Sequence, residues 1–111
     1  MNYITKRIEI TDEQIDDVMD AAMQGIAYWC DDFSLVGKVN PEHEGMWTSQ
    51  LLSKGYRVRV HDDEDDKTYI LTKAKLLKGW ALMDNLDIDN YDMNDADSVI
   101  QYALFGEQVY A

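Results

Sequence analysis

The chain has 111 residues, of which 46% are hydrophobic and 11% aromatic, and this favours a single folded domain spanning residues 1–111. Its 22 acidic residues outnumber its 10 basic residues, giving a formal net charge of −12 that excludes a conventional DNA binder and a protein drawn to anionic membranes. The lone Cys30 cannot form an internal disulfide, and no apolar leader or long apolar run is present, so we expect a cytoplasmic protein without a membrane span.

The first expected element is a long helix that begins after Thr11. Thr11 and Gln14 have the spacing of a capping box, in which each side chain bonds the other residue's backbone amide. Gly25 inside the pattern indicates close packing by another element. Ahead of the helix, Ile8 and Ile10 predict a short edge strand. The apolar face of the helix is predicted to consist of Ile15, Val18, Met19, Ala22, Met23, Ile26, Trp29, Cys30 and Phe33.

The middle of the chain predicts a surface connection, a short helix and a β-hairpin. Residues 34–45 contain the only proline, Pro41, among polar residues, which is typical of a surface connection. Residues 47–54 predict a short helix with Trp47, Leu51 and Leu52 inward and Gly55 just past its end. The segments 56–61 and 69–71 predict the two strands of a hairpin, and the acidic residues 62–67 its tip.

Two more helices are expected after the hairpin. Thr72 is the expected cap of the first, with Ala74, Leu77, Trp80 and Ala81 on its inner face. Asn94 is the expected cap of the second, which carries Ala96, Val99, Ile100, Ala103 and Leu104 and stops at Gly106. A final short strand at 108–110 would close the sheet. The predicted fold is therefore α+β, with a long N-terminal helix, a central β-hairpin, two further helices and short terminal strands joining the sheet.

No arrangement of residues predicts catalysis, a metal site or a cofactor. The six glycines are scattered, so no phosphate-binding loop is expected, and Cys30, His43 and His61 lack zinc-ligand spacing. The segment 87–92 has Tyr91 and Asp92 where a calcium loop needs a ligand and a glycine. Cys30 is expected at the C-terminal end of an acidic helix. The negative end of the helix dipole and the acidic side chains both raise the pKa of its thiol. We therefore expect a protein that is not an enzyme.

Most of the acidic residues occur in three segments: the outer face of the first helix, the hairpin tip and the loop from Asp84 to Asp97. If these segments converge, they form an anionic surface that imitates a nucleic-acid backbone; twelve net charges correspond to ~20 Å of duplex at one charge per ~1.7 Å. Such a surface attracts a basic partner, with Tyr91 or Trp47 as an anchor. If they point in different directions, the acids serve only solubility. The candidate partner-binding residues are Asp16, Asp17, Asp20, Asp62, Asp63, Glu64, Asp65, Asp66, Asp87, Asp89 and Asp92.

The segment Tyr28-Trp29-Cys30 and the segment from Ile100 to Tyr110, together with residues 57–62 and 69–72, resemble small acidic proteins encoded by phages and prophages of Gram-positive bacteria. The residues that carry the resemblance are mostly apolar or capping residues, so they imply a fold and no active site. The resemblance implies a mobile-element protein in a bacterial cytoplasm, a setting that includes anti-CRISPR and antirestriction inhibitors.

The leading hypothesis is an anti-CRISPR-type inhibitor that binds a host defence nuclease or surveillance complex, without direct contact to nucleic acid or membrane. The alternative is a phage accessory or structural interaction domain that forms a homodimer through an apolar patch and uses its acids only for solubility.

Overall fold

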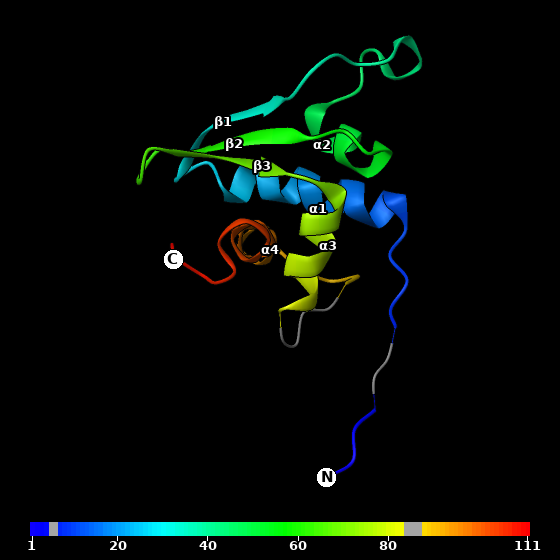
Figure 1. The fold of residues 1–111 in the computed structure, drawn as a ribbon, viewed down its shortest axis with the longest axis vertical. Coiled ribbons are helices and arrows are strands. Elements are labelled where there is room, and N and C mark those ends of the chain that lie inside the picture. The colour runs from blue at the N-terminus through cyan, green and yellow to red at the C-terminus, as the bar shows by residue number, and fades with distance from the viewer. Residues whose placement is uncertain (5–6, 84–87) are drawn as a thin grey trace.

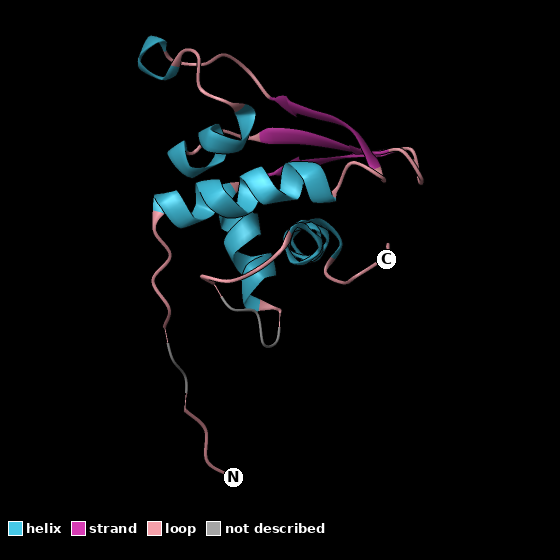
Figure 2. Ribbon diagram, turned by 180° about the vertical axis from the view of Figure 1, so that it is seen from behind, coloured by secondary structure: helices cyan, strands magenta, loops and turns pink. Residues whose placement is uncertain are grey.

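The computed structural model describes residues 1–4, 7–83 and 88–111. Within them, four α-helices accompany one three-stranded antiparallel sheet of order β1-β2-β3, which confirms the predicted α+β fold. The helices α1 (Asp12–Gly25), α3 (Lys73–Ala81) and α4 (Met93–Phe105) lie together on one side of the sheet (Figures 1 and 2). The apolar core lies between these helices and the sheet.

Helix α1 begins as predicted but ends earlier. Thr11 and Gln14 form both halves of the capping box. The apolar pattern predicted helical residues as far as Phe33, whereas the helix ends at Gly25 and the strand β1 starts at Cys30. A Cβ at Gly25 would lie 2.1 Å from the backbone oxygen of Met93, so this glycine lets α4 approach closely. The helical spacing continues past Gly25 because the turn and β1 face the same core.

The predicted hairpin is confirmed as β2 (Val58–Asp62) and β3 (Lys67–Leu71), with Val58, Val60 and Leu71 buried. The third strand was not predicted: β1 (Cys30–Leu35) pairs with β2 and takes in the first two residues of the expected surface connection. The predicted terminal strands are wrong, because neither Ile8–Ile10 nor residues 108–110 adopt strand structure. Backbone amides near the C-terminus bond a side chain of α4 instead.

The predicted short helix is present as α2 (Thr48–Leu51) followed by a 3₁₀ turn, Leu52–Lys54, and both leucines 51 and 52 are buried. Gly55 ends it with φ 97°, as its position past the helix suggested. The prediction for Trp47 is wrong, because this side chain is 75% exposed. A second 3₁₀ turn, Pro41–His43, lies in the connection before α2.

Helix α3 is capped by Thr72 as predicted, but its inner face is rotated. Leu76, Gly79 and Trp80 are buried, whereas Ala74 and Ala81 are exposed. The buried face of α3 includes Gly79 because α4 packs closely against it. A Cβ at Gly79 would lie 2.3 Å from the backbone nitrogen of Ala103.

Helix α4 ends before Gly106 as predicted, but Asp92, and not Asn94, is its N-cap. The Asp92 and Asp95 side chains form a reciprocal capping box there.

Candidate functional site

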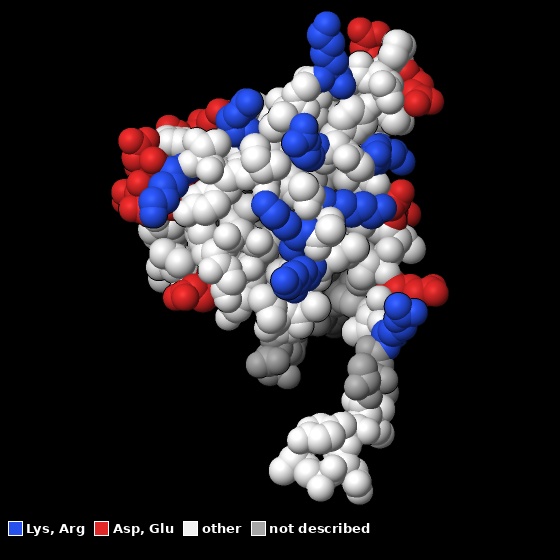
Figure 3. Space-filling model, viewed as in Figure 1, with Lys and Arg blue, Asp and Glu red and all other residues white. Residues whose placement is uncertain are grey.

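The end of the sheet where β2 turns into β3 carries a dense group of exposed carboxylates, here called the acidic hairpin end. Figure 3 shows acidic side chains gathered at this end of the molecule, on the left of the view. A β-bulge between Cys30 and Asp32 interrupts the pairing of β1 at this point, and Asp31 joins the group from this strand. The acidic hairpin end consists of Asp31, Asp63, Glu64, Asp65 and Asp66.

His61 links two of these carboxylates. Its Nδ1 lies 2.5 Å from Asp31 Oδ1 and its Nε2 lies 3.0 Å from Asp66 Oδ1. The hydrogen bonds to Asp31 and then Asp66 raise the pKa of His61, and the hydrogen bond from His61 lowers the pKa of Asp31. Lys67 forms an ion pair of 3.3 Å with Asp65. The charges of His61 and Lys67 are therefore engaged inside the cluster.

The same cluster contains a set of atoms of the kind that ligate metals. Ligand atoms of Asp31, His61 and Asp63 all lie within 4.8 Å of one another. A metal requires a neutral imidazole nitrogen, whereas the carboxylates beside His61 favour its protonated form. Protonation of His61 and binding of a cation are therefore mutually exclusive at this cluster.

Asp62, one of the predicted partner-binding residues, is only 2% exposed and is not part of this surface. One of its oxygens accepts from the backbone amides of Glu64 and Asp65, and the other accepts from the Tyr110 hydroxyl at 2.7 Å. Asp62 therefore holds the hairpin turn and the C-terminal segment in place. The Asp62 carboxylate raises the pKa of Tyr110, because its hydrogen bond favours the protonated phenol. Asp62 lies on the same face of β2 as the buried Val58 and Val60, and this alternation was the available signal for its burial. Its partner Tyr110 is 48 residues away and could not be identified from local spacing.

A second acidic surface lies on α1. Asp17 is exposed, while Asp16 and Asp20 accept hydrogen bonds from the hydroxyls of Ser53 and Ser49. These bonds tie α1 to α2 and the turn that follows it. Two of the predicted acidic carboxylates on α1 therefore have a structural partner.

The loop before α4 joins this surface. Gln14 Nε2 donates to Asp89 Oδ1 at 3.3 Å, and Gln14, Asp17, Asp89 and Tyr91 line a hollow of about 300 Å³ together with Ile88 and Asn90. Asp92 caps α4, and Asp87 lies outside the described residues. The α1 acidic face, defined by Asp16, Asp17, Asp20 and Asp89, thus unites two of the three predicted segments.

The predicted single anionic surface is resolved into two. The acidic hairpin end lies near the C-terminal end of α1, where the backbone amide of Asp63 bonds the Trp29 carbonyl, whereas Asp89 lies beside Gln14 near the N-terminal end. The 14-residue helix separates them by about 20 Å at ~1.5 Å per residue. Lysine and arginine side chains gather on the face over α3 and the hairpin strands, shown in Figure 3. On this view most of the basic side chains are therefore separate from the acidic hairpin end.

Asp97 is a buried carboxylate at the centre of a hydrogen-bond network that the sequence did not predict. It was expected in the acidic loop, yet it is 4% exposed and accepts from Tyr28 Oη at 2.7 Å, Trp29 Nε1 at 2.8 Å and Gln101 Nε2 at 2.9 Å. Burial and the bond to Asp97 raise the pKa of Tyr28 to about 12. Gln101 also accepts from the amides of Val109 and Tyr110. The network joins the turn after α1, helix α4 and the C-terminal segment. The indole of Trp29, which needs an acceptor when buried, was the available signal.

Cys30 lies at the start of β1 and not at the end of a helix, as the sequence had suggested. Its thiol is partly buried and donates to the backbone oxygen of Asp32 at 3.4 Å. Burial raises the pKa of the Cys30 thiol to about 11, so little thiolate is present near neutral pH. The environment of Cys30 suits a structural thiol and not a nucleophile.

Comparison with protein-family models, curated proteins and solved structures finds no match for this chain. Among the helices that the structure describes, none combines the length and apolar character that a bilayer span requires.

Proposed function

We propose that this protein is a non-enzymatic inhibitor that uses its acidic hairpin end to occupy the basic nucleic-acid-binding surface of another protein. The observation that carries the proposal is the gathering of exposed carboxylates from β1 and the β2–β3 turn at one end of the molecule. The partner class follows from the resemblance noted above: a host defence nuclease or surveillance complex.

The geometry of the turn supports this role because hydrogen bonds hold its backbone and tie the carboxylates of Asp31 and Asp66 to His61. Asp66 adopts φ 52°, a left-handed conformation that aspartate tolerates, and its carboxylate is held by His61. Asp62 anchors the amides of Glu64 and Asp65 from inside the fold. A surface arranged before binding loses less side-chain entropy when a basic partner docks. Its field also steers a cationic partner toward this end of the molecule.

The α1 acidic face offers a second contact for a large partner. It runs along α1, and its far end at Asp89 lies about 20 Å from the acidic hairpin end, a span that corresponds to ~12 charges along duplex DNA at one per ~1.7 Å. A basic groove built for a duplex is long enough to meet both surfaces. The hairpin end is the primary contact because more of its carboxylates are exposed.

The test compares two variants of equal net charge. The hairpin variant Asp63→Asn, Glu64→Gln, Asp65→Asn removes three exposed acids and leaves the buried Asp62 intact. The control variant neutralises three exposed acids elsewhere: Glu9→Gln, Glu42→Gln, Glu44→Gln. The assay is DNA binding and DNA cleavage by bacterial RNA-guided nucleases in the presence of each protein.

We expect the wild type and the control variant to inhibit one such nuclease and the hairpin variant to lose most of that inhibition. Equal inhibition by both variants would remove the hairpin end from the mechanism. If the wild type competes with DNA on none of the tested nucleases, the proposed function is contradicted.

A further inference from the structure

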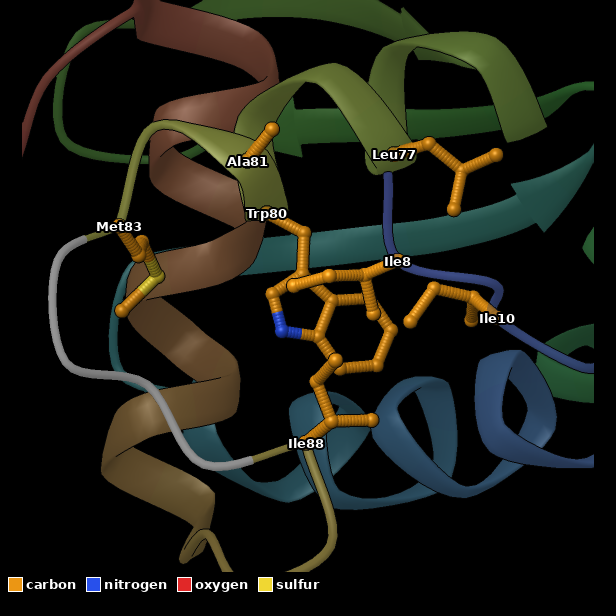
Figure 4. Close-up of a pocket in the computed structure, with 7 residues that line it drawn as sticks. All are labelled: Ile8, Ile10, Leu77, Trp80, Ala81, Met83 and Ile88. Carbon is orange, nitrogen blue, oxygen red and sulfur yellow. The ribbon is translucent and has the colours of Figure 1, made fainter. Parts of the chain in front are cut away.

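An apolar pocket lies beside α3, on a part of the molecule distinct from the acidic hairpin end. Its volume is about 410 Å³, within the range of binding pockets. Figure 4 shows the Trp80 indole projecting from α3 among the side chains of the N-terminal segment and the loop before α4. The lining residues are Ile8, Ile10, Leu77, Trp80, Ala81, Met83 and Ile88.

Trp80 is a buried donor without an acceptor in this pocket. The side chain is 6% exposed, and its Nε1 is the one buried side-chain nitrogen or oxygen that lacks a hydrogen-bond partner among the described residues. Leaving such a group unpaired is costly, so native structures nearly always satisfy it. An acceptor supplied by an incoming group would remove that cost. The pocket therefore suits an apolar group that carries a carbonyl or similar acceptor.

The N-terminal arm, residues 1–10, carries several strongly exposed apolar side chains. Met1, Tyr3, Ile4 and Ile8 are 104%, 83%, 85% and 70% exposed. Figure 1 shows residues 7–10 leaving the start of α1 and residues 1–4 lying away from the body of the molecule. The described part of the arm has no regular secondary structure, so its carbonyls lack partners in a helix or sheet.

We propose that the pocket receives the N-terminal arm of a second copy, so that two chains form a dimer by exchanging their arms. Tyr3 and Ile4 of one copy fill the apolar pocket of the other, and a main-chain carbonyl of the arm accepts from Trp80 Nε1. Each copy gives one arm and receives one, which is the self-complementary contact of a two-fold dimer.

Charge complementarity supports this occupant. The arm has Lys6 and Arg7 two to four residues after Tyr3 and Ile4. On the receiving copy, the hollow lined by Asp17 and Asp89 adjoins the apolar pocket and shares Ile88 with it. A step of two or three extended residues covers ~7–10 Å, which suits a side chain in the pocket and a cation in the next hollow. The apolar pocket and the adjoining acidic hollow together suit a segment in which apolar side chains are followed by two basic residues.

The same chain is a poor donor for its own pocket. Its Ile8 and Ile10 already form one wall, so Tyr3 and Ile4 would have to double back over them. The intervening residues 5–7 are Thr-Lys-Arg and contain none of the glycine, proline or asparagine that tight turns favour. An arm from a second copy enters without that reversal.

The experiment measures the oligomeric state of the full chain by sedimentation velocity and light scattering up to about 1 mM, the weak end of specific association. The arm variant is Tyr3→Ser with Ile4→Ser, and the pocket variant is Ala81→Trp, a change at an exposed rim residue that fills the pocket. The matched control removes two other exposed apolar side chains, Trp47→Ser with Val109→Ser. Circular dichroism checks that each variant is folded.

We expect the wild type and the control to dimerise and the arm and pocket variants each to weaken dimerisation at least about 10-fold. A mixture of the arm variant and the pocket variant should regain association, because the intact arm of one fits the open pocket of the other. Trp80→Phe should weaken the dimer about 2- to 10-fold by removing the donor. The hairpin variant used for the proposed function should dimerise normally, so the two proposals fail separately.

A wild type that stays monomeric at about 1 mM would overturn the proposal. A dimer that survives the arm variant would overturn it too, and so would a mixture of the two variants that fails to associate.

Discussion

Removal of the buried carboxylate of Asp97 is predicted to destabilise the fold strongly, whereas its replacement by an amide is not. In Asp97→Ala, the Trp29 indole loses its acceptor, Asp97 Oδ1, and the Gln101 amide loses the same acceptor while it keeps its bond to the Tyr110 carbonyl; Trp29 and Gln101 are both fully buried. Each unpaired buried donor costs about 1–3 kcal/mol. The Tyr28 hydroxyl belongs to a residue that is 50% exposed, so water takes the place of Asp97 there. The expected loss is about 3–5 kcal/mol once a small cavity is included.

The matched variant Asp97→Asn keeps the acceptor. Its Oδ1 can still receive both buried donors, and its new amide group can donate to the Tyr28 oxygen, so we expect a loss of only about 1–2 kcal/mol. Urea unfolding followed by circular dichroism gives both free energies of unfolding, and Glu42→Ala serves as a control at an exposed acid. Equal losses for Asn and Ala, or a loss below about 1 kcal/mol for Ala, would refute the hydrogen-bond reasoning.

Two further predictions concern packing and pH. Gly79→Ala should cost at least about 2 kcal/mol in thermal unfolding, because its Cβ would overlap the backbone of Ala103, and a mild effect would show that α3 and α4 are further apart than described. The raised pKa of His61 means that its ion pairs stabilise the fold fully below the unfolded pKa of about 6.5 and cease to do so as the pH rises through the folded value. Unfolding of His61→Asn measured against pH should lack this loss of stability, and an unchanged pH profile would contradict the role of Asp31 and Asp66.

Local signals in the sequence predicted the elements that depend on neighbours along the chain. The capping box of Thr11 and Gln14, the cap at Thr72 and the stop at Gly106 involve contacts within a few residues, and all three are confirmed. The hint of close packing at Gly25 is also confirmed, by its contact with Met93. These features are encoded locally and can be predicted from spacing alone.

The features that were missed depend on partners distant in sequence. Asp62 and Asp97 looked like surface acids, yet their partners Tyr110 and Trp29 are 48 and 68 residues away. Strand β1 was missed because its apolar residues continue the spacing of α1. For the candidate site, the exposed acids of the hairpin tip were predicted, but the contribution of Asp31 was not, since pairing of β1 with β2 brings it there.

The central claim, that the acidic hairpin end binds a basic partner, is tested most directly by the salt dependence of affinity for a nuclease that the wild type inhibits. Affinity of the wild type and of the Glu9, Glu42 and Glu44 control should fall steeply and in parallel as ionic strength rises from low to physiological. The variant at Asp63, Glu64 and Asp65 should bind more weakly at low salt and respond less to added salt. If the wild type, the control variant and the hairpin variant have the same affinity and the same dependence of affinity on ionic strength, the account is contradicted.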